Sequence, residues 1–303
     1  MDIPTNYNAE YAARRAARLR RIRQIKRRRR RRFFLFTLIL IIIGLIASCS
    51  LLRSDPKEKA VSTTVEDEFD YSTHYCYEED KLERYQSYHE DNPSLSLDEV
   101  VWQVNANLDK PFYGYDIPVE DITDPLVIVN KYYKVSPSQE PELTSADGYL
   151  MTPATAKAYR KMKADAAKKG LSIYAASTYR SVGYQKDLYN SYLQSAPKDV
   201  VDTSSARAGY SEHHTGLAID FIGSFGSLND FENTKEYPWV KDNCHKYGFI
   251  IRYTTENQWI TGYKNEPWHL RYVGVKVATD MMEKGISSFE EYKVKFIDHK
   301  PSK

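Results

Sequence analysis

The residues best suited to chemistry lie in two short stretches, 211–220 (SEHHTGLAID) and 266–269 (EPWH). Histidine and aspartate are zinc ligands, and a catalytic zinc site uses three protein ligands while keeping one position open. The first stretch offers His213 and Asp220, and the second offers His269. A single histidine among apolar residues is more often a hydrogen-bonded core residue than a ligand. The combination of all three favours a metal site.

The elements around these stretches predict an α+β domain over residues 146–303. Thr152 as N-cap and Pro153 predict a helix that ends at Gly170, with Ala158, Met162 and Ala166 on its buried face. A half-buried strand follows over 171–180, with Leu171, Ile173 and Ala175 pointing inward. Ser181 predicts the cap of a second helix with a buried stripe of Tyr184, Leu188 and Tyr192. The remaining elements are a helix that stops at Gly248, a strand over 249–253 and a helix over 272–285.

Gly216 is the expected turning point between the first two ligands. A glycine there permits a sharp turn after His213, so that the following apolar run can carry Asp220 back beside it. That run, Leu217 to Ile219, ends in a charge, and a buried strand normally avoids an end charge unless it is paired or binds a metal.

The N-terminal third of the chain has a different character. Residues 1–32 contain 13 Lys or Arg against two acidic residues, and residues 33–52 contain no charge. Twenty helical residues span about 30 Å, which matches the hydrocarbon core of a bilayer. The pattern predicts a basic cytoplasmic tail (1–32), a transmembrane signal anchor (33–52), a linker (53–70) and an N-terminal extension or subdomain (71–145). The bulk of the chain is then extracellular. The alternative, a cytoplasmic nucleic-acid-binding protein, is not favoured because the arginine run abuts the span and contains no aromatic residues.

The cysteines leave two questions open. The stretch IASC at 46–49 resembles a lipoprotein cleavage site, which would make Cys49 a lipidated N-terminus, although the long basic leader favours an uncleaved anchor. Cys76 and Cys244 lie in the translocated part, where a disulfide between them is possible.

Within 71–145, two segments have a pattern. Residues 94–105 predict a short helix with Leu97, Val100, Val101 and Val104 on its apolar face, and residues 124–135 predict a strand or an extended segment.

The ordered motifs resemble those of the zinc D-alanyl-D-alanine carboxypeptidases of the VanY type. The pattern S-x-H-x-x-G-x-A-x-D occurs at 211–220 and is followed by E-P-W-H at 266–269; STYRSVGYQ (177–185), GFIIRY (248–253) and TGYKNEPWHLRYVG (261–274) also match. The resemblance covers about residues 125–285. One departure is ARAGYSEH at 206–213, where relatives often have a proline before the glycine. The resemblance implies a small antiparallel sheet flanked by helices, as in the fold group that includes the hedgehog signalling domain.

The resemblance also implies the site roles. His213, Asp220 and His269 would bind Zn²⁺, Glu266 would be the general base, and Arg180 would bind either the oxyanion or the substrate's terminal carboxylate. The neighbours have supporting roles: Ser211 is expected to hydrogen-bond the loop, Gln185 to stabilise its helix or support the site from behind, His214 to line or support the site, and Trp268 to pack behind the metal.

The expected function is removal of a terminal D-alanine from peptidoglycan stem peptides by a membrane-anchored enzyme, with either D,D or L,D specificity. Two alternatives remain open: a peptidoglycan endopeptidase, and a zinc-stabilised cell-wall binding module without turnover. No nucleic-acid partner is expected.

Overall fold

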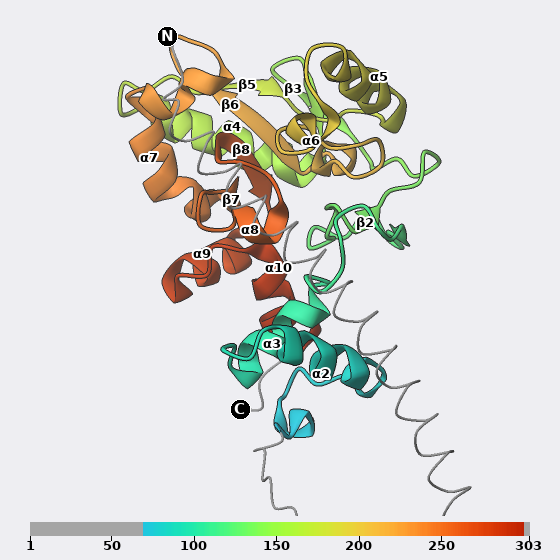
Figure 1. Cartoon of the computed structure of the whole chain (residues 1–303). Coiled ribbons are helices and arrows are strands. Elements are labelled where there is room, and N and C mark those ends of the chain that lie inside the picture. Colours follow the sequence, from blue (N-terminus) through green and yellow to red (C-terminus); the bar gives the residue numbers. More distant parts are fainter. Residues whose placement is uncertain (1–68, 300–303) are drawn as a thin grey trace, which may run out of the picture. The chain divides into compact units, whose positions relative to one another are not determined.

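Four antiparallel strands form the central sheet of this computed structural model, which describes residues 69–299. Their order in the sheet is β5-β6-β8-β7, so that the two strands from the motif stretches lie side by side in the middle. The bounds are β5 Tyr174–Ser177, β6 Ala218–Ile222, β7 Phe249–Tyr253 and β8 Glu266–Tyr272 (Figure 1). The expected small antiparallel sheet flanked by helices is therefore confirmed.

One face of the sheet packs on the main apolar core. Alternate residues of the strands, including Ile219, Phe221, Phe249 and Leu270, point to this face and are fully buried. Helices α4 (Pro153–Ala167) and α7 (Glu236–Asn243) contribute Met162 and Val240 and other residues to the same cluster. The strand residues between them, which include Asp220 and His269, therefore face away from this core.

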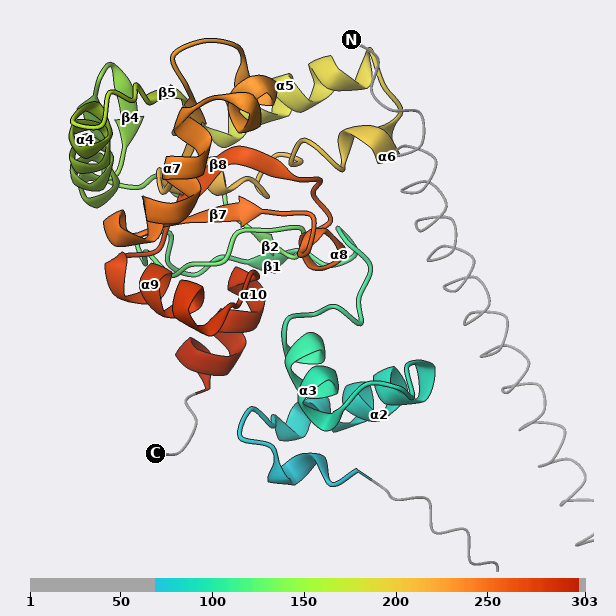
Figure 2. The same ribbon diagram turned by 90° about the vertical axis from the view of Figure 1, so that its left-hand side faces the viewer.

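The opposite face is covered by the C-terminal helices and by part of the N-terminal region. Ile250 of β7 packs with residues of α9 (Val275–Lys284) and α10 (Phe289–Tyr292), and Ile128 joins this cluster. Figure 2 shows α9 and α10 beneath β7.

Smaller elements complete the described chain. Two-residue strands β1 (Ile117–Pro118) and β2 (Tyr133–Lys134) pair in parallel, and β3 (Thr144–Ala146) pairs antiparallel with β4 (Tyr149–Met151). The other helices are α2 Leu82–Asp91, α3 Leu97–Asn105, α5 Val182–Leu193, α6 Lys198–Val201 and α8 Gln258–Thr261. Short 3-10 helices include η3 Glu212–Thr215, η4 Leu228–Asn233 and η5 Cys244–Tyr247.

Most predicted elements are present. Helix α4 is capped by the Thr152 side chain and has Pro153 in its first turn, α3 has the expected apolar face, and α7 with η5 stops at Gly248 in the left-handed conformation. Of the predicted segment 124–135, only Tyr133–Lys134 is a strand.

The predicted buried stripe of α5 is wrong. Tyr184 and Tyr192 are 59% and 46% exposed, whereas the buried residues are Gln185 and Tyr189. Both are polar side chains whose polar atoms are satisfied inside: Gln185 bonds Arg180 and the Ala206 carbonyl, and Tyr189 donates to Asp202. Hydrophobicity alone therefore misassigned the inner face of this helix.

The described residues from Asp70 onward form one compact unit. The N-terminal region has its own apolar cluster around Tyr85, Val101 and Trp102, and Ile260 and Val294 from the later chain join it. Cys76 and Cys244 are both free and buried in different apolar clusters, so the disulfide considered from the sequence is not formed.

The predicted tail (1–32), anchor (33–52) and all of the linker (53–70) except Phe69 and Asp70 lie outside the described residues. Among residues 69–299, none of the helices is long and apolar enough to cross a membrane.

Candidate metal and active site

A tight turn positions the first candidate ligand. The turn η3 begins after Ser211, whose hydroxyl accepts a hydrogen bond from the His213 backbone N–H, and ends at Gly216 with φ +66°. A Cβ on Gly216 would lie 2.9 Å from a methyl carbon of Leu143 and 3.2 Å from the Thr152 backbone nitrogen, so both the backbone angle and the available space favour glycine. The chain then enters β6 directly.

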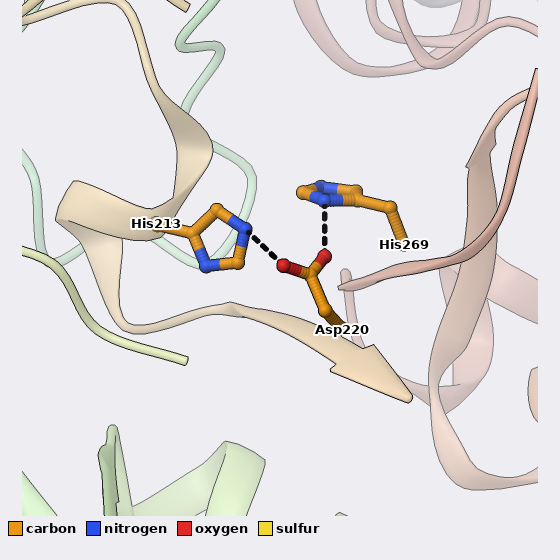
Figure 3. A group of neighbouring side chains, drawn as sticks. All are labelled: His213, Asp220 and His269. Carbon is orange, nitrogen blue, oxygen red and sulfur yellow. Dashed lines mark hydrogen bonds and ion pairs between the residues drawn. The ribbon is translucent and has the colours of Figure 1, made fainter. Parts of the chain in front are cut away.

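The other two candidate ligands come from neighbouring strands. Asp220 of β6 and His269 of β8 are direct partners in the antiparallel pair. Asp220 Oδ1 lies 3.0 Å from His269 Nδ1, and Asp220 Oδ2 lies 3.2 Å from His213 Nε2. Figure 3 shows the carboxylate between the two imidazoles. Donor atoms of all three residues lie within 4.8 Å of one another, and all three residues are buried.

The hydrogen bonds fix which imidazole nitrogens are available. His213 Nδ1 lies 2.5 Å from the carbonyl oxygen of Thr178, which can only accept, so Nδ1 carries the proton. His213 Nε2 therefore presents a lone pair, and this buried atom has no hydrogen-bond partner among residues 69–299. An orphaned buried acceptor facing a carboxylate is what a missing cation would explain, and two imidazoles with one carboxylate suit zinc.

The local electrostatics agree with this assignment. Burial, helped by the Arg180 charge, lowers the pKa of His213 to about 4, so its imidazole is neutral near pH 7. Burial alone would raise the pKa of Asp220, but the two imidazoles hold that pKa well below its ordinary value. Burial opposes the charge on His269 as well, yet Asp220 and Glu212 raise its pKa to about 9. The site thus attracts positive charge.

Glu266 is at the start of β8 and lines the same cleft as His269. Two residues three apart on a regular strand would face opposite sides. The start of β8 is not regular, however: its pairing with β7 shifts between Ile251 and Tyr253, and Pro267 has no N–H for a ladder bond. Because of this irregularity, Glu266 can line the same cleft as His269. Burial raises the pKa of Glu266 to about 7, even though His269 opposes this rise. A carboxyl group with a pKa near neutrality is suited to acid–base work.

Arg180 faces the ligands from the end of the β5 segment. Its Nη2 lies 3.5 Å from Asp220 Oδ2, and its Nη1 donates to Gln185 Oε1 at 2.8 Å. The buried Nε of Arg180 has no partner among the described residues. Gln185 is in turn held by the Ala206 carbonyl, so the guanidinium is fixed but retains donors for a ligand.

The remaining predicted residues have structural contacts. His214 Nδ1 donates to the Arg180 carbonyl at 2.7 Å, and His214 Nε2 accepts from the Gly209 N–H at 3.1 Å, which ties the turn to the Arg180 segment. Burial lowers the pKa of His214 to about 4. Trp268 is half-buried against the main core and lines the cleft.

The sequence reasoning missed Glu212, whose fully buried carboxylate contacts His269 Nε2 at 3.2 Å. It also missed Arg252 and Arg271, which bind Glu212 from two strands. A signal was present for Arg252, which lies inside the otherwise apolar strand Phe249–Tyr253, because a buried charge requires a partner.

These groups line one cleft of about 290 Å³. Besides the three candidate ligands, Glu266 and Arg180, its walls include Tyr253, Tyr263 and Lys264. The cleft therefore combines three metal-ligand donors, a carboxyl group with a raised pKa, and a guanidinium.

Comparisons with known proteins agree with this arrangement. The profile of the family VanY, described as D-alanyl-D-alanine carboxypeptidase, matches residues 148–275. A D-alanyl-D-alanine carboxypeptidase of Enterococcus faecium is 31% identical over 241 residues, which are 74% of this chain and 73% of that protein. The chain belongs to the VanY family of D-alanyl-D-alanine carboxypeptidases.

Other relatives extend the comparison. The Bacillus subtilis protein YodJ is 37% identical over 191 residues, 57% of this chain and 70% of that protein. The solved structure of the LdcB LD-carboxypeptidase superposes with a TM-score of 0.54 at 34% identity, covering 58% of this chain and 88% of that one. The structure of VanYB in complex with D-alanine-D-alanine superposes with a TM-score of 0.50 at 28% identity, covering 55% and 96%. The expectation of a zinc metallo-carboxypeptidase of this type is confirmed, whereas the individual residue roles stay predictions.

Proposed function

We propose that this VanY-type protein is a membrane-anchored extracellular zinc carboxypeptidase that removes terminal D-alanine from peptidoglycan stem peptides. The observation that carries the proposal is the meeting of His213, Asp220 and His269 within 4.8 Å in a cleft that also contains Glu266 and Arg180. The names of the relatives support the substrate class, since one structure holds D-alanine-D-alanine and another is an LD-carboxypeptidase. Both D,D and L,D cleavage are compatible with this cleft.

In this proposal His213 Nε2, an Asp220 oxygen and His269 Nδ1 would hold the zinc ion. When bound, zinc supplies a Lewis acid and lowers the pKa of its water to about 7. The protein's part is to accept a hydrogen bond from the far nitrogen of each imidazole, through the Thr178 carbonyl for His213 and the Glu212 carboxylate for His269, so that the other nitrogen can present its lone pair to the metal.

Glu266 and Arg180 then perform the steps that need a proton and a charge. Glu266 accepts a proton from the attacking water and returns it to the departing amine, which its raised pKa permits in both directions. Arg180 binds either the substrate's terminal carboxylate or the oxygen that becomes negative, with a planar fork that fits both.

The membrane anchor is proposed from the sequence. The uncharged stretch 33–52 follows a 32-residue tail that contains 13 basic residues. This charge distribution favours a cytoplasmic tail and an extracellular enzyme domain. Protease treatment of intact cells tests this: the enzyme domain is expected to be digested while an N-terminal epitope is protected. Protection of both would contradict the proposed location.

The central experiment is incubation of the full-length protein with defined tetrapeptide and pentapeptide muropeptides, with and without a chelator. Release of free D-alanine from the pentapeptide indicates D,D cleavage, and release from the tetrapeptide indicates L,D cleavage. Loss of both with the chelator and recovery with zinc supports the metal. Cleavage of cross-linked dimers without free D-alanine would instead show an endopeptidase, and stoichiometric zinc binding without any turnover would show a binding module.

A further inference from the structure

Glu212 lies in the centre of a buried charge network beside the candidate metal site. Its Oε1 accepts hydrogen bonds from Arg252 Nε at 2.8 Å and from Arg271 Nη1 at 3.0 Å. Its Oε2 lies 3.2 Å from His269 Nε2. The Glu212 and arginine side chains are completely buried. A completely buried carboxylate stays charged only when it is paired with opposite charges through hydrogen bonds, as Glu212 is with these arginines.

The network continues away from the site. Arg252 donates two further hydrogen bonds to Glu290 of α10, at 2.9 and 2.6 Å. Glu290 also accepts from Asn130 Nδ2 at 3.1 Å. Two carboxylates therefore balance two guanidinium groups, and Glu290 closes the network outside the region that the family profile matches.

The second arginine reaches the N-terminal region as well. Arg271 Nη2 donates to the carbonyl oxygens of Pro125 and Val127, at 3.1 and 2.8 Å. Both arginines donate to Oε1 of Glu212, so Oε2 remains for His269. The orientation of the Glu212 carboxylate is thus set by groups that do not touch the cleft.

This arrangement determines which His269 nitrogen carries the proton. Two guanidinium groups, which can only donate, lie at hydrogen-bond distance from Glu212 Oε1, so the carboxylate of Glu212 acts as an acceptor. Nε2 of a neutral His269 must then be the donor, and Nδ1 is left with its lone pair toward Asp220 Oδ1, 3.0 Å away.

We propose that Glu212 is the positioning residue for His269: it fixes the imidazole with its proton on Nε2 and Nδ1 toward the metal, and Arg252 and Arg271 hold Glu212 in this orientation. The inference rests on the proposed metal site and adds to it a residue that does not contact substrate or metal.

The substitution Glu212→Gln gives a directional test. The two arginines are donors and would face the amide oxygen of the new side chain, which leaves its amide NH₂ toward His269. Nε2 would then have to accept, the proton would move to Nδ1, and the nitrogen facing Asp220 could no longer bind metal. Loss of such a partner typically costs about 10–100-fold in metal affinity.

The matched control is Glu290→Gln. It removes a buried carboxylate from the same Arg252 but leaves the contact with His269 intact. Zinc affinity of the full-length proteins is measured by competition with a chromogenic chelator, beside thermal unfolding of the metal-free forms. We expect both variants to unfold at a lower temperature, and only Glu212→Gln to lose at least about 10-fold in zinc affinity. Equal zinc loss in both, or affinity within about threefold of wild type in Glu212→Gln, overturns the proposal.

A second measurement does not depend on the folding of any variant. Long-range ¹H–¹⁵N NMR of zinc-loaded wild-type protein with ¹⁵N-labelled histidine reports which His269 nitrogen bears hydrogen, with a His269→Gln sample for assignment. A proton on Nε2 supports the proposal, and a proton on Nδ1 overturns it. Zinc binding by wild type, measured in the same titration, tests the proposed function separately: its absence counts against the metal site itself, whichever variant is compared.

Discussion

Asp220 and His269 are direct cross-strand partners in β6 and β8, and their side chains meet with 3.0 Å between Oδ1 and Nδ1. The register of the sheet therefore decides whether the site exists. A slip of one residue would turn one of the two side chains to the apolar face that carries Ile219 and Leu270. Two of the three candidate ligands are thus fixed by backbone pairing, and only His213 depends on a turn.

The first prediction concerns Asp220→Asn. The substitution keeps the shape but removes the charge that lies between the two imidazoles, so zinc affinity is expected to fall by more than about 100-fold, beyond the loss typical of an outer partner. Calorimetric zinc titration measures it, with Asp187→Asn on the exposed face of α5 as control. Zinc affinity equal to that of the control would show that Asp220 is not a ligand.

The second prediction concerns Glu266→Gln and the pH dependence of stability. The pKa of Glu266 is raised to about 7 in the fold, so the native metal-free protein binds the extra proton and its stability decreases as pH rises from about 4.5 to 7. Above this window the buried charge costs up to about 3 kcal/mol, which the glutamine variant avoids. The variant is therefore expected to gain in Tm relative to wild type at pH 8 but not at pH 4.5, in chelator.

The same variant is expected to lose turnover by about 100-fold or more, because the proton acceptor is gone. Glu232→Gln, at an exposed position, is the control for both measurements. Turnover at the wild-type rate by Glu266→Gln would remove Glu266 from the general-base role.

The third prediction concerns Arg180→Ala. The guanidinium is held by Gln185 and has a free Nε, so its loss is expected to reduce kcat/KM by about 100-fold. A rise in KM with unchanged kcat assigns it to the terminal carboxylate of the substrate, and a fall in kcat with unchanged KM assigns it to the oxyanion. Arg160→Ala, on the exposed side of α4, is the control. Unchanged kinetic constants in Arg180→Ala would exclude both roles.

The fourth prediction compares two glycines. Gly216→Ala places a side chain at φ +66° and close to Thr152, so unfolding is expected to become easier by about 2 kcal/mol, or roughly 4–8 °C in Tm. Gly183→Ala, in α5 with open space around it, is expected to be neutral or stabilising by up to about 1 kcal/mol. Equal Tm values for the two variants would contradict the structural reason given for Gly216.

Local patterns predicted the fold where several local signals agree. Helix α4 has a hydroxyl cap, a first-turn proline and a regular apolar face, and all three effects agree there. The predicted buried face of helix α5 was wrong because the true inner face consists of hydrogen-bonded polar side chains. A hydrophobicity pattern cannot distinguish such side chains from solvent-facing ones.

The site residues were also predicted where they are close in sequence and missed where their contacts are distant in sequence. His213, Gly216 and Asp220 are near in sequence, and a turn followed by a strand brings the two side chains together. Glu212 was overlooked because its partners, Arg252 and Arg271, are 40 and 59 residues away, and only the sheet brings them to one point. The apolar strand around Arg252 indicates that this arginine needs a partner, but the local sequence does not show which carboxylate provides it.

The two buried free thiols, Cys76 and Cys244, can be used to detect local unfolding of the chain. Burial raises the pKa of Cys76 to about 11 and that of Cys244 to about 12, so neither is a thiolate near neutral pH, and both are shielded from reagents. Alkylation of Cys76 or Cys244 therefore marks molecules that have opened, and each of these two thiols reports a different apolar cluster. Mass spectrometry of the two labelled peptides over time would separate unfolding of the N-terminal helices from unfolding of the sheet.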